Sequence, residues 1–216
     1  MNIKKRIIDV HIVESNKTAE PDAEASALVS VLKISGISAH QYHPQSREEL
    51  ADTFQCIANH PRCIPHHRHF LPFLHFALHA SRNGVFVRGS ELVTWHNLLA
   101  MLAPLRERLE GNLLISMSAC HGFYGYRLAC SFERYTYHFL VGTRKSLDWR
   151  DAVLAFHVFY HSLFFRQARL QSAVTAMNSS LLSRTYAFDY TFGSEVQRNY
   201  LKTFSIDEIV AVRTEQ

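Results

Sequence analysis

Two apolar segments, each ending near a reactive side chain, most constrain how this chain folds. One covers residues 71–81 and carries His79, and the other covers residues 112–122 and carries Cys120. Short apolar runs bounded by glycine or charge are typical of parallel strands buried on both faces. The helix-like segment over residues 94–109 has the size of a crossover between neighbouring parallel strands. Because the chemistry of such sheets gathers beyond the carboxyl ends of their strands, we expect His79 and Cys120 to meet at one rim.

The rest of the chain repeats an order of strand, helix, strand and helix. Apolar patterning predicts strands over 7–13, 37–42 and 136–141, and helices over 23–34, 46–57, 149–165 and 167–182, with a strand and helix within 185–204. Ser46 and Glu49 have the spacing of a capping box at the start of one helix. This order predicts an α/β protein in three layers, with a mostly parallel central sheet flanked by helices. Residues 1–216 suit a single domain.

Composition narrows the possible partners and locations. The net charge is only +4 and the basic residues are scattered, so nucleic acid is not an expected partner. No apolar run approaches the ~18 residues of a membrane span. The apolar run near the N-terminus, which begins at Ile7, is interrupted by Asp9, His11 and Glu14. This pattern indicates a strand instead of a signal peptide. Four cysteines without a secretory signal predict reduced thiols and a cytoplasmic location.

The sequences LHFALHAS, NGVFVRGSELVTWHNLLAML and NLLISMSACHGFYG lie within residues 68–145. This region resembles the core of the CHAT-type caspase-like cysteine peptidases. In that family a His ends one strand, a glycine-bearing hairpin follows, a helix begins W-x-x-L, and Ser-Ala-Cys ends the next strand. The resemblance implies a caspase-like fold and a His79/Cys120 dyad. It also implies an oxyanion hole made by the backbone N–H groups of Cys120 and Ala80, where the family usually has glycine instead of Ala80.

A cysteine and a histidine at one rim are suited to covalent catalysis. An imidazolium or a helix N-terminus beside a thiol favours the nucleophilic thiolate. We therefore expect Cys120 to attack a peptide carbonyl and His79 to protonate the departing amine, before water releases the acyl-enzyme. His75 points to the same face as His79 but lies four residues deeper, so we expect it to be buried. His121 is the second choice of base.

Other residues receive structural or binding roles in this interpretation. Cys56, Cys63 and Cys130 have no apparent catalytic partner, and we interpret them as structural. Ser118 and Arg144 are candidates for lining the substrate pocket, where Arg144 would favour an acidic group. The expected partners are a peptide or protein substrate and an activating or inhibitory protein. Two alternatives stay open: an inactive caspase-like scaffold that binds a partner, and a small α/β hydrolase or binding protein.

Residues 60–69, HPRCIPHHRH, contain four histidines and Cys63. Their local spacing matches no compact metal site, because there is no Cys-x-x-Cys and no helical His pair that encloses a glutamate. We therefore expect an exposed loop with incidental histidines and no metal. The sequence also lacks a P-loop and a glycine-rich dinucleotide motif, so no cofactor is expected.

Overall fold

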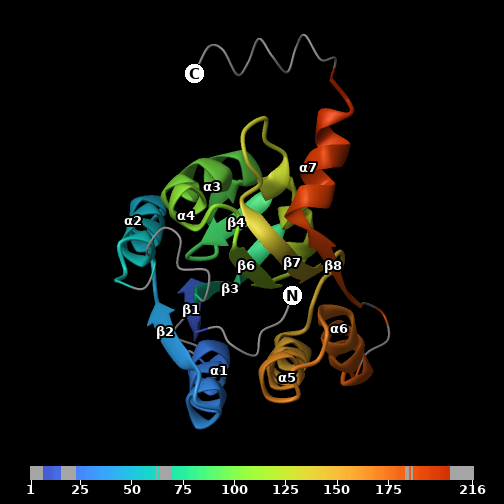
Figure 1. Ribbon diagram of the computed structural model, residues 1–216. Helices are drawn as coiled ribbons and strands as arrows, with labels where there is room; N and C mark the ends of the chain where they lie inside the picture. Colours follow the sequence, from blue (N-terminus) through green and yellow to red (C-terminus); the bar gives the residue numbers. More distant parts are fainter. Residues whose placement is uncertain are drawn as a thin grey trace.

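A computed structural model describes residues 7–15, 23–61, 63, 70–182, 185 and 187–204. Its sheet has the strand order β2-β1-β3-β6-β7-β8, with β4 and β5 forming a hairpin on the end of β3 (Figure 1). The first five strands of this order are parallel, and β8 adds an antiparallel edge to β7. The strands of the described residues are β1 (Ile7–Ser15), β2 (Ser38–Tyr42), β3 (Phe70–Ser81), β4 (Gly84–Val87), β5 (Glu91–Thr94), β6 (Leu113–Ser118), β7 (Tyr137–Thr143) and β8 (Phe188–Phe192).

Helices cover both faces of this sheet. They are α1 (Ala23–Ile34), α2 (Arg47–Ala58), α3 (Trp95–Met101), α4 (Ala103–Leu109), the 3₁₀ helix η2 (Gly122–Ala129), α5 (Trp149–Tyr160), the π-helix η3 (His161–Phe165), α6 (Leu170–Ser179) and α7 (Gly193–Leu201). One face packs against α1, α5 and α6, and the other packs against α2, α3 and α4 (Figure 1). The predicted three-layer α/β sandwich with a mostly parallel sheet is therefore confirmed.

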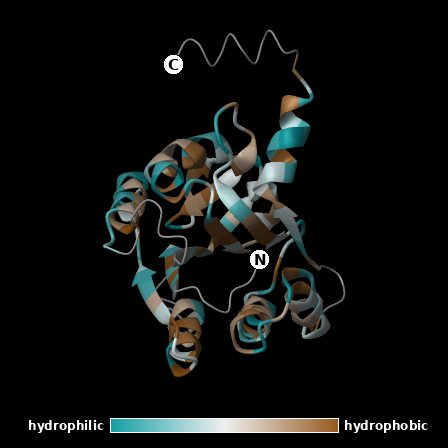
Figure 2. Ribbon diagram, viewed as in Figure 1, coloured by the Kyte–Doolittle hydropathy of each residue, from teal (hydrophilic) through white to brown (hydrophobic). Residues whose placement is uncertain are grey.

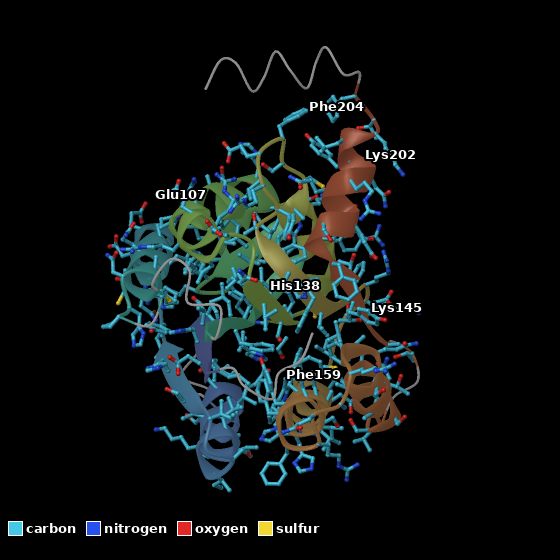
Figure 3. The ribbon with its side chains drawn as sticks, in the orientation of Figure 1. Glu107, His138, Lys145, Phe159, Lys202 and Phe204 are labelled. Carbon is cyan, nitrogen blue, oxygen red and sulfur yellow. The ribbon has the colours of Figure 1, made fainter. Side chains whose placement is uncertain are left out.

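Alternating side chains of β3 supply two separate cores. Phe73 and Ala77 pack with α1, α5 and α6, whereas Leu74 and Phe76 pack with α2, α3 and α4. Successive residues of a strand point to opposite faces, so both sets leave water when helices cover both sides. Figure 2 shows hydrophobic residues, in brown, on central strands of the sheet and along parts of the helices that flank it, whereas the edge strand β2 is mostly hydrophilic. Phe159, labelled in Figure 3, belongs to the first of these cores and is fully buried.

Several predicted boundaries differ from the observed ones. The single helix expected over 94–109 divides at Leu102 into α3 and α4, because Pro104 cannot donate to a continuing helix. The helix expected over 149–165 changes to a π-helix at His161, and the one over 167–182 narrows to Leu170–Ser179. None of the helices in the described ranges combines the length and apolar character that crossing a bilayer requires.

In the histidine-rich stretch, the burial of His60 and Cys63 differs from the expected exposed loop. Cys63 is 1% exposed and belongs to the core beside α2, and His60 is half-buried. The prediction of an exposed loop is therefore wrong for Cys63, because its side chain is part of the buried core. Residues 62 and 64–69 lie outside the described residues. The single domain over residues 1–216 stays a prediction.

Candidate active site at the ends of β3 and β6

The two central strands, β3 and β6, bring His79 and Cys120 to the same edge of the sheet. Ala77 of β3 pairs with Ser118 of β6 in parallel register, and His79 and Cys120 each lie two residues further along. Since neighbouring parallel strands lead to the same edge of a sheet, both residues lie at the rim where the pairing of β3 with β6 ends. The register, set by apolar side chains deep in the sheet, thus positions the pair.

Both side chains belong to the lining of one cavity. It has a volume of about 310 Å³ and lies between the ends of β3 and β6, the start of α1 and the start of α5. Its lining also includes Glu24, Ser118, Leu147 and Trp149. This volume lies at the lower end of the range of about 300–1,000 Å³ that is typical of ligand pockets.

The thiol of Cys120 is half-buried and contacts the loop that precedes α5. Its Sγ accepts a hydrogen bond from the backbone N–H of Leu147 at 3.3 Å, and donates to the carbonyl oxygen of Leu147 at 3.7 Å. The N–H contact suits a thiol or a thiolate, whereas the carbonyl contact suits only the protonated form. Leu147 therefore both holds the sulfur and limits access to it.

His79 has a different environment. Its side chain is exposed although its backbone lies within β3, where it pairs with Phe86 of β4. Within the described part of the chain its imidazole forms no hydrogen bond or ion pair, so both ring nitrogens are available to a bound molecule. The hairpin of β4 and β5 fixes the backbone beneath the imidazole. His79 can thus reorient without breaking a hydrogen bond or an ion pair of the described residues.

The turn after Cys120 directs His121 away from the cavity wall. His121 has a left-handed backbone with φ of 56°, and its N–H donates to the carbonyl of Lys145 at 2.9 Å. Its Nδ1 lies 2.7 Å from the carbonyl oxygen of Arg144, and a donor at Nδ1 completes that hydrogen bond. The His121 imidazole therefore hydrogen-bonds to the loop after β7, whereas the His79 imidazole has no hydrogen bond among the described residues.

The wall below the thiol contains a buried polar network that sequence reasoning missed. Ser118 donates a hydrogen bond to Glu24 of α1, and Glu24 Oε1 lies 3.5 Å from Nε2 of the fully buried His75. That last separation is an ion-pair distance and not a hydrogen bond. His75 is buried below the rim, as its position in the strand predicted.

Tyr160 of α5 continues this network into the core. Its hydroxyl lies 3.0 Å from Nδ1 of His75 and donates to Ser116 Oγ at 3.2 Å. Burial raises the pKa of Tyr160 above its ordinary value, so the hydroxyl stays protonated at neutral pH. The only sequence signal for this network was three polar residues, His75, Ser116 and Ser118, at alternate positions of otherwise apolar strands.

The remaining predicted site residues lie around the cavity. Ser118 is in its wall, but its hydroxyl is engaged by Glu24. Arg144 is exposed, with its guanidinium 4.0 Å from the ring centre of Phe123 and its Nε 3.5 Å from Asp189. Neither Arg144 nor Ala80 is among the described residues that line the cavity. The ammonium group of Lys145, labelled in Figure 3, donates a hydrogen bond to the carbonyl of Thr185, and Lys145 is not among the described residues that line the cavity.

Fold and site together define a three-layer α/β protein with a Cys/His pair on one cavity at the ends of its two central strands. No protein-family model matches this chain, and no curated protein matches its sequence. The resemblance to the CHAT-type peptidases thus stays a prediction from the motifs around His79 and Cys120.

Proposed function

We propose that this chain is a cysteine endopeptidase in which Cys120 is the nucleophile and His79 the acid-base group. The observation that carries the proposal is that His79 and Cys120 each lie two residues beyond the paired Ala77 and Ser118 of adjacent strands and line the same cavity. A Cys/His pair reached by a peptide from solvent has the chemistry of a thiol peptidase. No cofactor or metal is needed for this reaction.

The proposed reaction has two halves. His79 takes the proton of the Cys120 thiol as the sulfur forms a bond to the substrate carbonyl carbon, and the carbon–nitrogen bond breaks as His79 gives that proton to the departing amine. His79 then takes a proton from water as the water oxygen bonds to the thioester carbon. The carbon–sulfur bond breaks, the acid product leaves, and the proton returns to the sulfur to restore the thiol. The backbone N–H groups of Cys120 and Ala80 are the proposed oxyanion donors, and each donor of this kind contributes about 3 kcal/mol to lowering the barrier.

Access to the sulfur is the proposed point of control. Leu147 contacts Cys120 through both its backbone groups, and Leu147, Asp148 and Trp149 line the cavity. A protein partner that moves residues 144–148 would free the carbonyl contact of the thiol, whereas one that fixes them would inhibit. Within this proposal Ser118 contacts the substrate in the cavity, Arg144 contacts it beyond the cavity, and the enzyme acts in the cytoplasm.

A cleavage-site profile tests the proposed activity. A mixture of cytosolic proteins would be incubated with wild type and with Cys120→Ala, with and without a cell extract as a source of an activating partner. New peptide termini that depend on Cys120 support the proposal. Identical profiles for the two proteins under both conditions contradict it.

The second candidate is a caspase-like scaffold without activity that binds a protein partner. The observation that favours it is the engagement of the Cys120 thiol by Leu147. In that case Cys120→Ala and His79→Ala would leave both the cleavage profile and partner binding unchanged. A peptidase would lose cleavage in both variants.

A further inference from the structure

A second cluster of ionisable side chains lies where β1 and β2 pair, on the opposite face of the sheet from the Cys120 cavity. Asp9 and His11 occupy alternate positions of β1 and so share one face of the sheet, while His40 of β2 pairs directly with His11. His60 approaches from the turn that ends α2. Figure 1 shows β2 and α2 at the edge of the molecule beside β1. This face packs against α2, whereas His79 and Cys120 line a cavity on the side of α1 and α5.

Three of these residues present ligand atoms to a common point. One carboxylate oxygen of Asp9 and one ring nitrogen each of His40 and His60 all lie within 4.8 Å of one another. Ligands of a tetrahedral zinc ion are separated by about 3.3 Å, given bonds of about 2.0–2.1 Å. Small side-chain rotations would bring the three ligand atoms from their present separations to the shorter ones that a zinc ion requires. Two of the ligands lie on adjacent strands, which fixes their spacing.

The burial of the cluster favours a cation at its centre. Asp9 is fully buried, and a carboxylate removed from water is stabilised when a positive charge lies beside it. Two half-buried imidazoles supply neutral nitrogen ligands without adding further negative charge. The turn that carries His60 is held by a 2.8 Å hydrogen bond from the N–H of Cys63 to the carbonyl of His60.

His11 provides an independent observation at the same place. It is fully buried, its Nδ1 exchanges a hydrogen bond with the hydroxyl of Tyr42 at 3.1 Å, and its Nε2 has no hydrogen-bond partner among the described residues. Its ring stacks on that of His40 with centres 5.1 Å apart and lies 6.1 Å from that of His60. A buried ring nitrogen without a hydrogen-bond partner destabilises the folded protein. A metal ion nearby, or a water molecule bound to that ion, would give this nitrogen a partner.

We propose that Asp9, His40 and His60 bind one divalent transition-metal ion. A carboxylate with two imidazoles matches the ligand preference of Zn²⁺, and leaves at least one coordination position for water or His11. The ion ties the edge of the sheet, β1 and β2, to the end of α2. Local spacing within residues 60–69 did not predict it, because two of its ligands come from strands about 20 and 50 residues earlier in the chain.

Zinc titration of the untagged, full-length protein tests this site. After removal of metal with a chelator, Zn²⁺ binding would be measured by calorimetry, and Co²⁺ binding by its visible absorption. We expect one Zn²⁺ per chain, and an affinity at least about 100-fold weaker in Asp9→Asn and in His40→Ala. His161→Ala is the matched control, since His161 is exposed on the opposite side of the sheet and should not alter binding.

Circular dichroism would show whether each variant folds, and His60→Ala replaces any that does not. Wild-type protein offers a test that needs no variant: Zn²⁺ should raise its unfolding temperature, and Co²⁺ should give the intense absorption of a tetrahedral site. Absence of stoichiometric binding to wild type, or unchanged affinity in the folded variants, overturns the proposal. Peptidase activity is not the readout, so failure here leaves the Cys120 proposal unaffected.

Discussion

His79 of β3 and Cys120, in the turn after β6, each lie two residues beyond the paired Ala77 and Ser118. Their placement on one cavity therefore depends on the register of the two strands, because a slip of one residue would turn every side chain of the slipped strand to the other face. Changes that leave the sheet intact but alter the surrounding loops should tune the site without dispersing it. The variants described below distinguish effects on the sheet and its core from effects on the loops around the site.

The network under the cavity should matter for stability. Tyr160→Phe removes the hydroxyl that contacts His75 Nδ1 and donates to Ser116, leaving two buried polar groups without that partner. We expect the free energy of unfolding to fall by about 1–3 kcal/mol. Urea denaturation measures this change in the free energy of unfolding. Tyr190→Phe is the control, because Tyr190 packs on the same core without a hydroxyl hydrogen bond among the described residues. Equal losses in the two variants would refute this role.

Close backbone contact should make Gly142 indispensable for the site. A Cβ at Gly142 would lie 2.7 Å from the nitrogen of Phe123 and 2.8 Å from the carbonyl carbon of Gly122, so Gly142→Ala must displace the turn after Cys120. We expect a loss of about 1–3 kcal/mol in unfolding free energy together with slower labelling of Cys120.

Gly36→Ala provides the comparison for that variant. Nothing lies within 4 Å of a Cβ there, but φ is +72°, so the substitution should cost roughly 1–2 kcal/mol from backbone strain alone. Labelling of Cys120 should stay at the wild-type rate. A similar change in labelling for both variants would show that global stability, and not the local turn, sets the reactivity of the thiol.

The loop over the thiol should control its accessibility. Asp148 is the N-cap of α5 and accepts a hydrogen bond from the N–H of Arg150 at 2.8 Å. Asp148→Ala removes this cap, at a cost of about 1 kcal/mol, and loosens the adjoining Leu147. We expect iodoacetamide to modify Cys120 several-fold faster, as followed by mass spectrometry. Asp148→Asn keeps the acceptor and should react as wild type does, and a slower reaction in Asp148→Ala would argue against gating by this loop.

Helix α2 offers a test of capping away from the site. The Ser46 side chain accepts a hydrogen bond from the N–H of Glu49 at 3.2 Å. Ser46→Ala should lower the free energy of unfolding by about 1 kcal/mol, while Ser46→Asn should preserve it. Thermal unfolding of the three proteins gives the comparison. No difference between the two variants would mean that the cap contributes nothing measurable.

Local signals predicted much of the fold. The helix expected over 23–34 has those bounds, because its apolar periodicity ends before Gly36, which adopts a left-handed backbone. The Ser46–Glu49 box predicted the start of α2, although the Glu49 carboxylate accepts from the N–H of Gln45 and not from that of Ser46. The division at Leu102 was missed because the apolar pattern continues through it, and only Pro104 marked the break.

Residues brought together from distant elements were not predictable in the same way. The rim position of His79 and Cys120 followed from strand ends, which local patterning indicates. The contact of Glu24 with Ser118 and His75 joins the first helix to two later strands, and nothing in the sequence near Glu24 signals it. The approach of Asp9 to His60 likewise depends on where α2 ends relative to β1. Such contacts are set by tertiary packing.

Reaction with a peptidyl electrophile tests the central claim most directly. Wild type, His79→Ala and His121→Ala would be treated with an acyloxymethyl ketone peptide, and the modified residue and its rate determined by mass spectrometry. We predict a single modification at Cys120, unchanged in His121→Ala and at least about 100-fold slower in His79→Ala. Modification of the exposed Cys56 at a comparable rate, or a rate at Cys120 that does not depend on His79, would contradict the account.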